Sequence, residues 1–299
     1  MRDKVWLSLG VALVTGASLG GGAIAAVPET GHAVAGVRAG HDPSARDAVA
    51  PSLWIAQHAR PAGGEHGKAG EGGEGGKAGE GGERGGAANL TRSDAAYLTQ
   101  LGLIRGHLDV GTELYRIGDQ KTAVTHMKHP EDELYAALKP ALARRGAPGF
   151  DNELKTLADK VEKNAGPSEV EAAYNSLLAA IAKAESAVAK PTAPQIGEVI
   201  HNLVRTAAAE YSEALEDGRI VEAHEYQDAL GFVRVAENWL AKLKRTGADP
   251  SIVTEIEKQI ASIKPAWTGV VPPKTAPVDL SRIHSAAARI EIATLGLKD

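Results

Sequence analysis

The 299-residue chain contains no cysteine, and this absence excludes several kinds of site. Without a thiol there is no disulfide framework, no CxxC redox pair, no iron–sulfur cluster and no cysteine nucleophile. Covalent attachment of haem through CxxCH is excluded for the same reason. Aromatic residues make up only 4% of the chain, while Ala and Leu are abundant. This composition favours a helical bundle over a β-sandwich.

Other chemistry is missing as well. The formal net charge of -5 gives no reason to expect nucleic acid as a partner. The zinc-protease signature HExxH is absent, and the glycine-rich tract contains no GxxxxGK[ST] nucleotide loop. We therefore expect no catalytic residue and no nucleotide cofactor, and a binding role rather than catalysis.

Residues 1–25 have the pattern of a secretory signal peptide. Arg2 and Lys4 provide a positive start, residues 5–19 are mostly apolar, and Ala23 and Ala25 fit a small-residue cleavage site. Retention of this segment as a membrane anchor is the alternative. No later run is long and apolar enough to cross a bilayer. The sequence predicts a periplasmic or secreted protein with no stable membrane span after processing.

A disordered region is expected over residues 26–90. Its core, residues 61–88, is a low-complexity tract of Gly, Glu and Lys that has almost no apolar surface to bury. A glycine-rich tether of this length spans about 30 Å on average.

Helical periodicity dominates from residue 91 onward, and the predicted fold class is all-α. The pattern predicts two tandem, duplicated four-helix bundle units, residues 91–190 and 195–299. The predicted helices cover residues 93–117, 120–129, 130–145, 151–164, 169–189, 196–215, 221–244, 252–263 and 280–297.

A shift of 100 residues aligns residues 103–148 with residues 203–248 without a gap. Identical pairs include Arg105 and Arg205, Glu113 and Glu213, Gly118 and Gly218, and Arg145 and Arg245. An internal duplication would explain both the length of the helical region and its two glycine turns.

The stretch 106–135 contains three of the ten histidines and many carboxylates. Gly118 breaks its helical pattern, so we expect two helices that fold back about this turn. His107 and His129 lie equally far from Gly118, while His126, His129 and Glu133 follow one helical stripe. The predicted metal ligands are His107, His126, His129 and Glu133, with Glu113 as the alternative carboxylate. Such a set suits iron, copper or zinc.

Two observations leave other interpretations open. Pro130 and the acidic residues after it fit the first turn of a helix, and His126 and His129 fit the end of the preceding one, so these side chains are equally consistent with helix ends. In the second unit Ala207, Tyr226, Ala229 and Val233 stand at the positions of the predicted ligands. A second cluster, Glu213, Glu222, His224 and Glu225, is weaker because Glu222 and His224 point in different helical directions.

A duplicated four-helix unit with histidine and carboxylate ligands, preceded by an export signal, resembles the imelysin-like periplasmic proteins associated with iron uptake. The resemblance covers about residues 91–299. That family's Gly-x-His-x-x-Glu motif is not matched, since the nearest strings are residues 106–109, GHLD, and residues 129–132, HPED. We carry over no ligand from the motif.

The sequence thus predicts an exported helical protein that binds a transition metal ion in its first unit, for capture or handover. The alternative is a non-enzymatic interaction or structural protein of the cell envelope, which would bind an envelope protein and no metal.

Overall fold

A computed structural model of the chain describes residues 86–299. The predicted signal peptide and all but the end of the predicted disordered region lie outside the described residues. The fold is all-α, as predicted, with one two-stranded β-hairpin. The elements are α1 (Ala87–Arg92), α2 (Asp94–Arg116), α3 (Gln120–His129), the π-helical turn η2 (Pro130–Leu134), α4 (Tyr135–Arg145), α5 (Asp151–Glu162), α6 (Pro167–Glu185), α7 (Ala193–Glu213), β1 (Leu215–Glu216), β2 (Arg219–Ile220), α8 (Ala223–Lys244), α9 (Pro250–Ile263), the 3₁₀ turn η3 (Lys264–Ala266) and α10 (Leu280–Thr294).

The helical hairpin α2–α3 forms as the sequence predicts. The Ser93 hydroxyl accepts a hydrogen bond from the Ala96 amide and so caps the start of α2. Gly118 ends the hairpin's first arm with φ of +88°, a conformation that glycine adopts without strain. The Asp119 carboxylate then caps α3 through the Thr122 amide. The two helices pack against each other along their length.

The second arm of the hairpin is interrupted by a π-helical turn. Pro130 follows α3 directly and has no amide hydrogen, so the regular hydrogen-bond ladder cannot continue through it. The chain passes through η2 and resumes as α4. Such π-turns are frequent at functional sites. Here η2 carries three consecutive acidic residues at positions 131–133.

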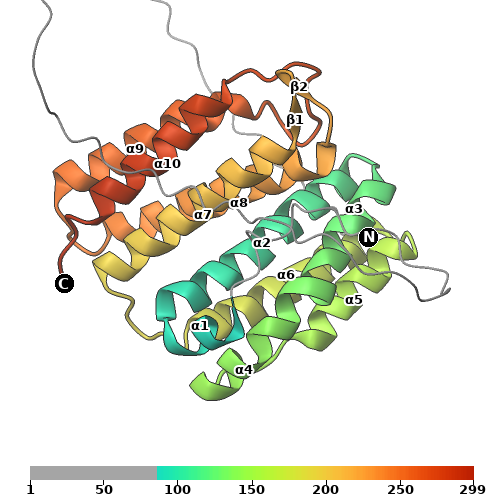
Figure 1. Cartoon of the computed structure of the whole chain (residues 1–299). Helices are drawn as coiled ribbons and strands as arrows, with labels where there is room; N and C mark the ends of the chain where they lie inside the picture. Colours follow the sequence, from blue (N-terminus) through green and yellow to red (C-terminus); the bar gives the residue numbers. More distant parts are fainter. Residues whose placement is uncertain (1–85) are drawn as a thin grey trace, which may run out of the picture. The chain divides into compact units, whose positions relative to one another are not determined.

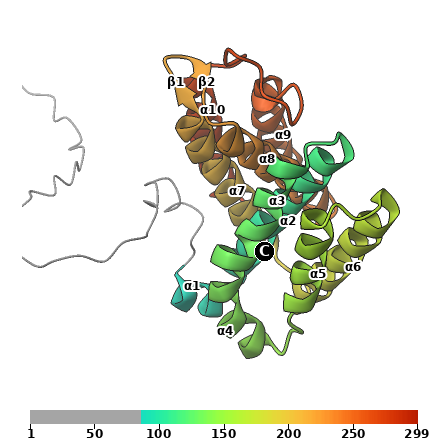
Figure 2. The ribbon, with the colours of Figure 1, turned by 90° about the vertical axis from the view of Figure 1, so that its right-hand side faces the viewer.

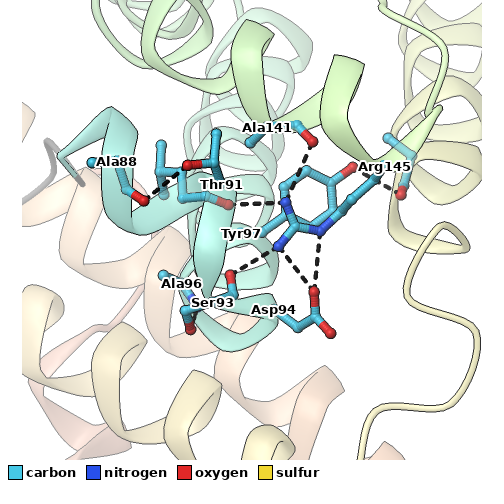
Figure 3. Close-up of polar contacts among 10 residues, drawn as sticks. Ala88, Thr91, Ser93, Asp94, Ala96, Tyr97, Ala141 and Arg145 are labelled. Atoms are coloured by element: carbon cyan, nitrogen blue, oxygen red, sulfur yellow. Dashed lines mark hydrogen bonds and ion pairs between the residues drawn. The ribbon is translucent and has the colours of Figure 1, made fainter.

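Arg145, at the end of α4, holds α1 and α2 in place (Figure 3). Its guanidinium donates to the Leu90 and Ser93 carbonyls and to the Asp94 carboxylate, and lies 4.2 Å from the centroid of the Tyr97 ring. Residues 87–90, expected to be disordered, are instead helical, and Leu90 is buried in the core. The buried leucine and the arginine contacts explain why order begins before residue 91.

Eight of the described helices form two rings of four that have the same order. In the first ring α2 contacts α3 and α6, and α5 contacts both of these; Figure 2 shows α5 and α6 side by side. In the second ring α7 contacts α8 and α10, and α9 contacts both of these (Figure 1). Each ring's first turn contains a glycine with positive φ, Gly118 in one and Gly218 in the other. This common order is what a duplication predicts, although the duplication itself stays a prediction.

The two rings share one apolar core. Helix α2 packs against both α7 and α8, and the buried apolar side chains of the two halves form a continuous cluster. Within the described residues, no helix has the length and apolarity needed to cross a bilayer.

Candidate metal centre

Four histidine rings gather around one buried carboxylate where α2, α3 and α8 meet. We call this group the His–Asp cluster; its members are His107, His126, His129, His224 and Asp228. The rings form two stacked pairs. The centroids of His107 and His129 lie 4.6 Å apart, and those of His126 and His224 lie 4.2 Å apart.

Glycines allow the helices to come close enough for these contacts. Helices α2 and α8 cross with backbone against backbone, since a Cβ added to Gly231 would lie 2.4 Å from the Gly106 carbonyl oxygen. Helix α3 approaches α2 at Gly111, where an added Cβ would lie 3.0 Å from the His126 Cβ. His107 follows Gly106 directly, and Asp228 lies one turn before Gly231. The close crossing therefore places His107 and Asp228 together.

Asp228 is at the centre of the cluster and is 1% exposed. Its Oδ1 lies 2.7 Å from the His107 Nδ1 and 3.0 Å from the His126 Nδ1, and its Oδ2 lies 3.2 Å from the His224 Nδ1. Two ligands at 90° around an ion with bonds of about 2.1 Å are about 3.0 Å apart, and tetrahedral ligands are about 3.4 Å apart. The separations between Oδ1 and the two imidazole nitrogens are thus close to those of neighbouring metal ligands.

The protonation of His126 follows from its second nitrogen. The Gln227 amide donates to the Val270 carbonyl at 2.9 Å, so its oxygen faces the His126 Nε2 at 2.8 Å and must accept a hydrogen from it. A neutral His126 then presents a bare lone pair at Nδ1. Fixing of one imidazole nitrogen by a hydrogen bond is the usual way in which proteins orient a metal-binding histidine.

This tautomer brings two acceptor atoms together. The His126 Nδ1 and the Asp228 Oδ1 are 3.0 Å apart, yet among the described residues neither has a partner with hydrogen-bond geometry. Two lone pairs at this distance repel each other unless a cation lies between them. A proton at this position would make His126 a cation that carries hydrogen on both ring nitrogens. A metal ion satisfies both atoms at once.

The charges of the cluster depend on one another. Burial alone would raise the pKa of the Asp228 carboxyl, but protonated His107 and His126 rings would outweigh it and hold this pKa well below its usual range. A bound metal ion would take the place of these protons. Burial lowers the pKa of His224, but Glu225 and Asp228 outweigh burial, so the pKa of His224 is raised from its ordinary value. The carboxylate is therefore ionised, as a metal ligand must be.

A cavity of about 450 Å³ connects the cluster with solvent. His129, His224 and Asp228 line it together with residues of α3, η2, α7 and α8. The lining includes five carboxylates and one lysine: Asp132, Glu133, Glu210, Glu225, Asp228 and Lys128. An acidic cavity of this kind attracts cations and raises their local concentration.

The structure brings together most of the ligands predicted from the sequence. His107, His126 and His129 meet in the cluster, and Glu133 is half-buried in the wall of the cavity. Glu113 lies elsewhere, because its carboxylate pairs with Arg234 at 2.5 Å. His126, at the end of α3, is not a solvated helix-end side chain, because it is fully buried, whereas His129 is partly exposed in the wall of the cavity.

The sequence placed His224 and Glu225 of α8 in a separate, weaker cluster and did not indicate that α8 joins the predicted ligands through Asp228. Asp228 and His224 lie in the second half of the chain, so the site is not confined to the first unit as expected. The shift by 100 residues pairs Asp228 with Lys128, which is not a metal-binding residue, so the alignment did not indicate Asp228 as a ligand. One signal was available: His224 and Asp228 are four residues apart and so share one face of a helix.

The buried donors, two imidazoles and one carboxylate, match the composition of the sites that hold ferrous iron in non-haem proteins. Comparisons with curated proteins and with solved structures found no match. A comparison with family models found one: residues 189–295, which contain α7–α10, match the model of the iron permease-associated 4-helix bundle domain. This match supports a helical bundle related to iron uptake, although not the imelysin-like family specifically.

Proposed function

We propose that the protein is exported and captures a transition metal ion, ferrous iron above all, for handover to another component of a transport system. The His107, His126 and Asp228 side chains bind the ion, with His224 and His129 beside them. The observation that carries the proposal is the contact between two acceptors, the His126 Nδ1 and the Asp228 Oδ1, in a fully buried position.

Two features favour iron. Two histidines and one carboxylate are the donors typical of ferrous sites with open coordination positions. The family model that matches α7–α10 is described as iron permease-associated. Zinc and copper accept the same donors and are the competitors to be measured.

The acidic cavity supports capture and handover rather than permanent storage. It reaches the cluster from solvent and is lined by carboxylates. An incoming cation can bind their oxygens in turn as it moves through the cavity. Export would place this cavity outside the cytoplasm, as the pattern of residues 1–25 predicts.

Metal content tests the proposal directly. The purified chain is dialysed without oxygen against ferrous iron, and against zinc and copper in parallel, and bound metal is measured by mass spectrometry. Wild-type protein should retain iron, and Asp228→Asn should lose it. The amide keeps the shape of the carboxylate, so this variant should fold, which circular dichroism checks. His284→Ala removes an exposed histidine of α10 and should retain the wild-type content.

A folded wild-type protein that retains none of the three metals would refute the proposal. Retention of equal metal by Asp228→Asn would show that the ion is bound elsewhere, which would refute the assignment of the site. Localisation is tested separately, by fractionation of cells that produce the full chain.

A further inference from the structure

The two oxygens of Asp228 face different sets of donors. Oδ1 contacts the His107 and His126 nitrogens, and Oδ2 contacts the His224 Nδ1 at 3.2 Å. His224 Nδ1 also lies 3.9 Å from the Glu225 Oε2. Two groups of possible ligands therefore share this carboxylate: His107, His126 and Asp228, and His224, Glu225 and Asp228.

The second group differs from the first in its surroundings. The first group is fully buried, whereas His224 and Glu225 are partly exposed in the wall of the cavity. The His224 Nε2 is buried and has no hydrogen-bond partner among the described residues. The His224 Nδ1 faces the Asp228 and Glu225 carboxylates, so this nitrogen could bind a metal ion together with them.

The lining of the cavity also favours a second cation. Five carboxylates line it, and its single lysine, Lys128, already pairs with Glu162 at 2.7 Å. A divalent cation on the buried group would contact Asp228, whereas Glu225 lies beside His224 in the wall of the cavity. The acidic wall would attract a second cation to His224 and Glu225.

We infer that the protein holds two metal ions bridged by Asp228, a buried ion on His107 and His126 and an exchangeable ion on His224 and Glu225. A carboxylate that binds one ion through each oxygen holds them at the spacing of about 3.5–4 Å found in two-metal sites. The outer ion lies at the cavity, so it is the first to be loaded from solvent and the first to be released. This inference rests on the proposed function and adds a second site to it.

Stoichiometry tests the inference. Purified chain and variants are equilibrated with ferrous iron without oxygen, and bound iron per chain is measured after removal of free metal. Wild-type protein should bind two ions, Glu225→Gln one, and Asp228→Asn none. Glu216→Gln removes an exposed carboxylate near the start of α8 and should still bind two. Thermal unfolding of each variant confirms that it is folded.

The outcomes separate the two proposals. Saturation of the wild type at one ion, with Glu225→Gln unchanged, would overturn the bridged pair and leave the proposed function standing. Absence of any bound iron would overturn both. Two ions in the wild type that persist in Glu225→Gln would show that the second ion is bound outside the group of His224 and Glu225, and would also overturn the inference.

Discussion

The crossing of α2 and α8 offers a sharp test, because one methyl group should disturb it. Gly231→Ala places a Cβ 2.4 Å from the carbonyl oxygen of Gly106. Ordinary contacts of a Cβ begin at about 3.4 Å, so the two backbones must separate by about 1 Å. Both partners are helical backbone and cannot rotate away as a side chain would. The separation must therefore be transmitted to the helices themselves.

Two effects of opposite sign act on the stability of the Gly231→Ala variant. Alanine is the better helix former by about 1 kcal/mol, so without the clash the substitution would stabilise α8. Overpacking between rigid elements costs about 1–3 kcal/mol, and we expect this term to dominate. For an ordered region of this size, each kcal/mol lowers the melting temperature by about 2–4 °C. The melting temperature should fall by several degrees.

The metal site should be affected more strongly than the fold. His107 and Asp228 lie beside the crossing, and their 2.7 Å contact would lengthen toward about 3.7 Å if the helices separate by 1 Å. That is beyond the separation of about 3.0–3.4 Å that neighbouring metal ligands require. Iron affinity should fall by about 10- to 100-fold, the range seen when the support of a ligand is removed.

Thermal unfolding and anaerobic titration with ferrous iron measure the two effects. Gly166→Ala is the control, because its added Cβ would have its nearest neighbour at 4.0 Å. It should leave the iron affinity unchanged. A Gly231→Ala protein with wild-type iron affinity would refute the claim that the close crossing assembles the site, even if its melting temperature fell.

Three further predictions concern other parts of the molecule. Gln227→Leu removes the acceptor that fixes His126, so iron affinity in the titration should fall by about 10- to 100-fold while the fold is kept; unchanged affinity would contradict the assigned tautomer. Arg145→Ala removes a mostly buried guanidinium with several partners and should cost about 2–3 kcal/mol in chemical unfolding with no loss of bound iron. Glu113→Gln breaks a partly exposed ion pair with Arg234 and should change stability by less than about 1 kcal/mol and leave metal content as it is; loss of iron would return Glu113 to the site.

The helices were predictable because each carries its own signals. Ser93 and Gly118 mark helix ends by side-chain capping and positive φ, and these are local properties. Helix α6 begins at Pro167, two residues before the predicted start at residue 169. The β-hairpin at residues 215–220 was missed because its strands have two residues each, too few to show alternation. Helix α1 was missed because its stability comes from Leu90 and from Arg145, which is distant in the sequence.

The candidate site was predictable only in its first half. His107, His126 and His129 meet because a single turn folds one segment back on itself, and symmetry about Gly118 is visible in the sequence. The contribution of α8 depends on how one helical ring packs against the other. That packing depends on the close contact between Gly106 and Gly231, and a glycine within a helix does not indicate from the sequence which residue it will contact.

Duplication predicts two equivalent sites, but among the described helices this close crossing occurs once. If the shift by 100 residues reflects duplication, the reverse crossing would pair Thr206 with Glu131, where the existing one pairs Gly106 with Gly231. Neither residue permits two backbones to touch. The segment that corresponds to α8 in the first half is α3 to α4, and η2 interrupts it at residue 131, while α8 itself is continuous. Residues 86–299 therefore contain one such crossing, and two bound ions would have to share Asp228 rather than occupy two copies of the same site.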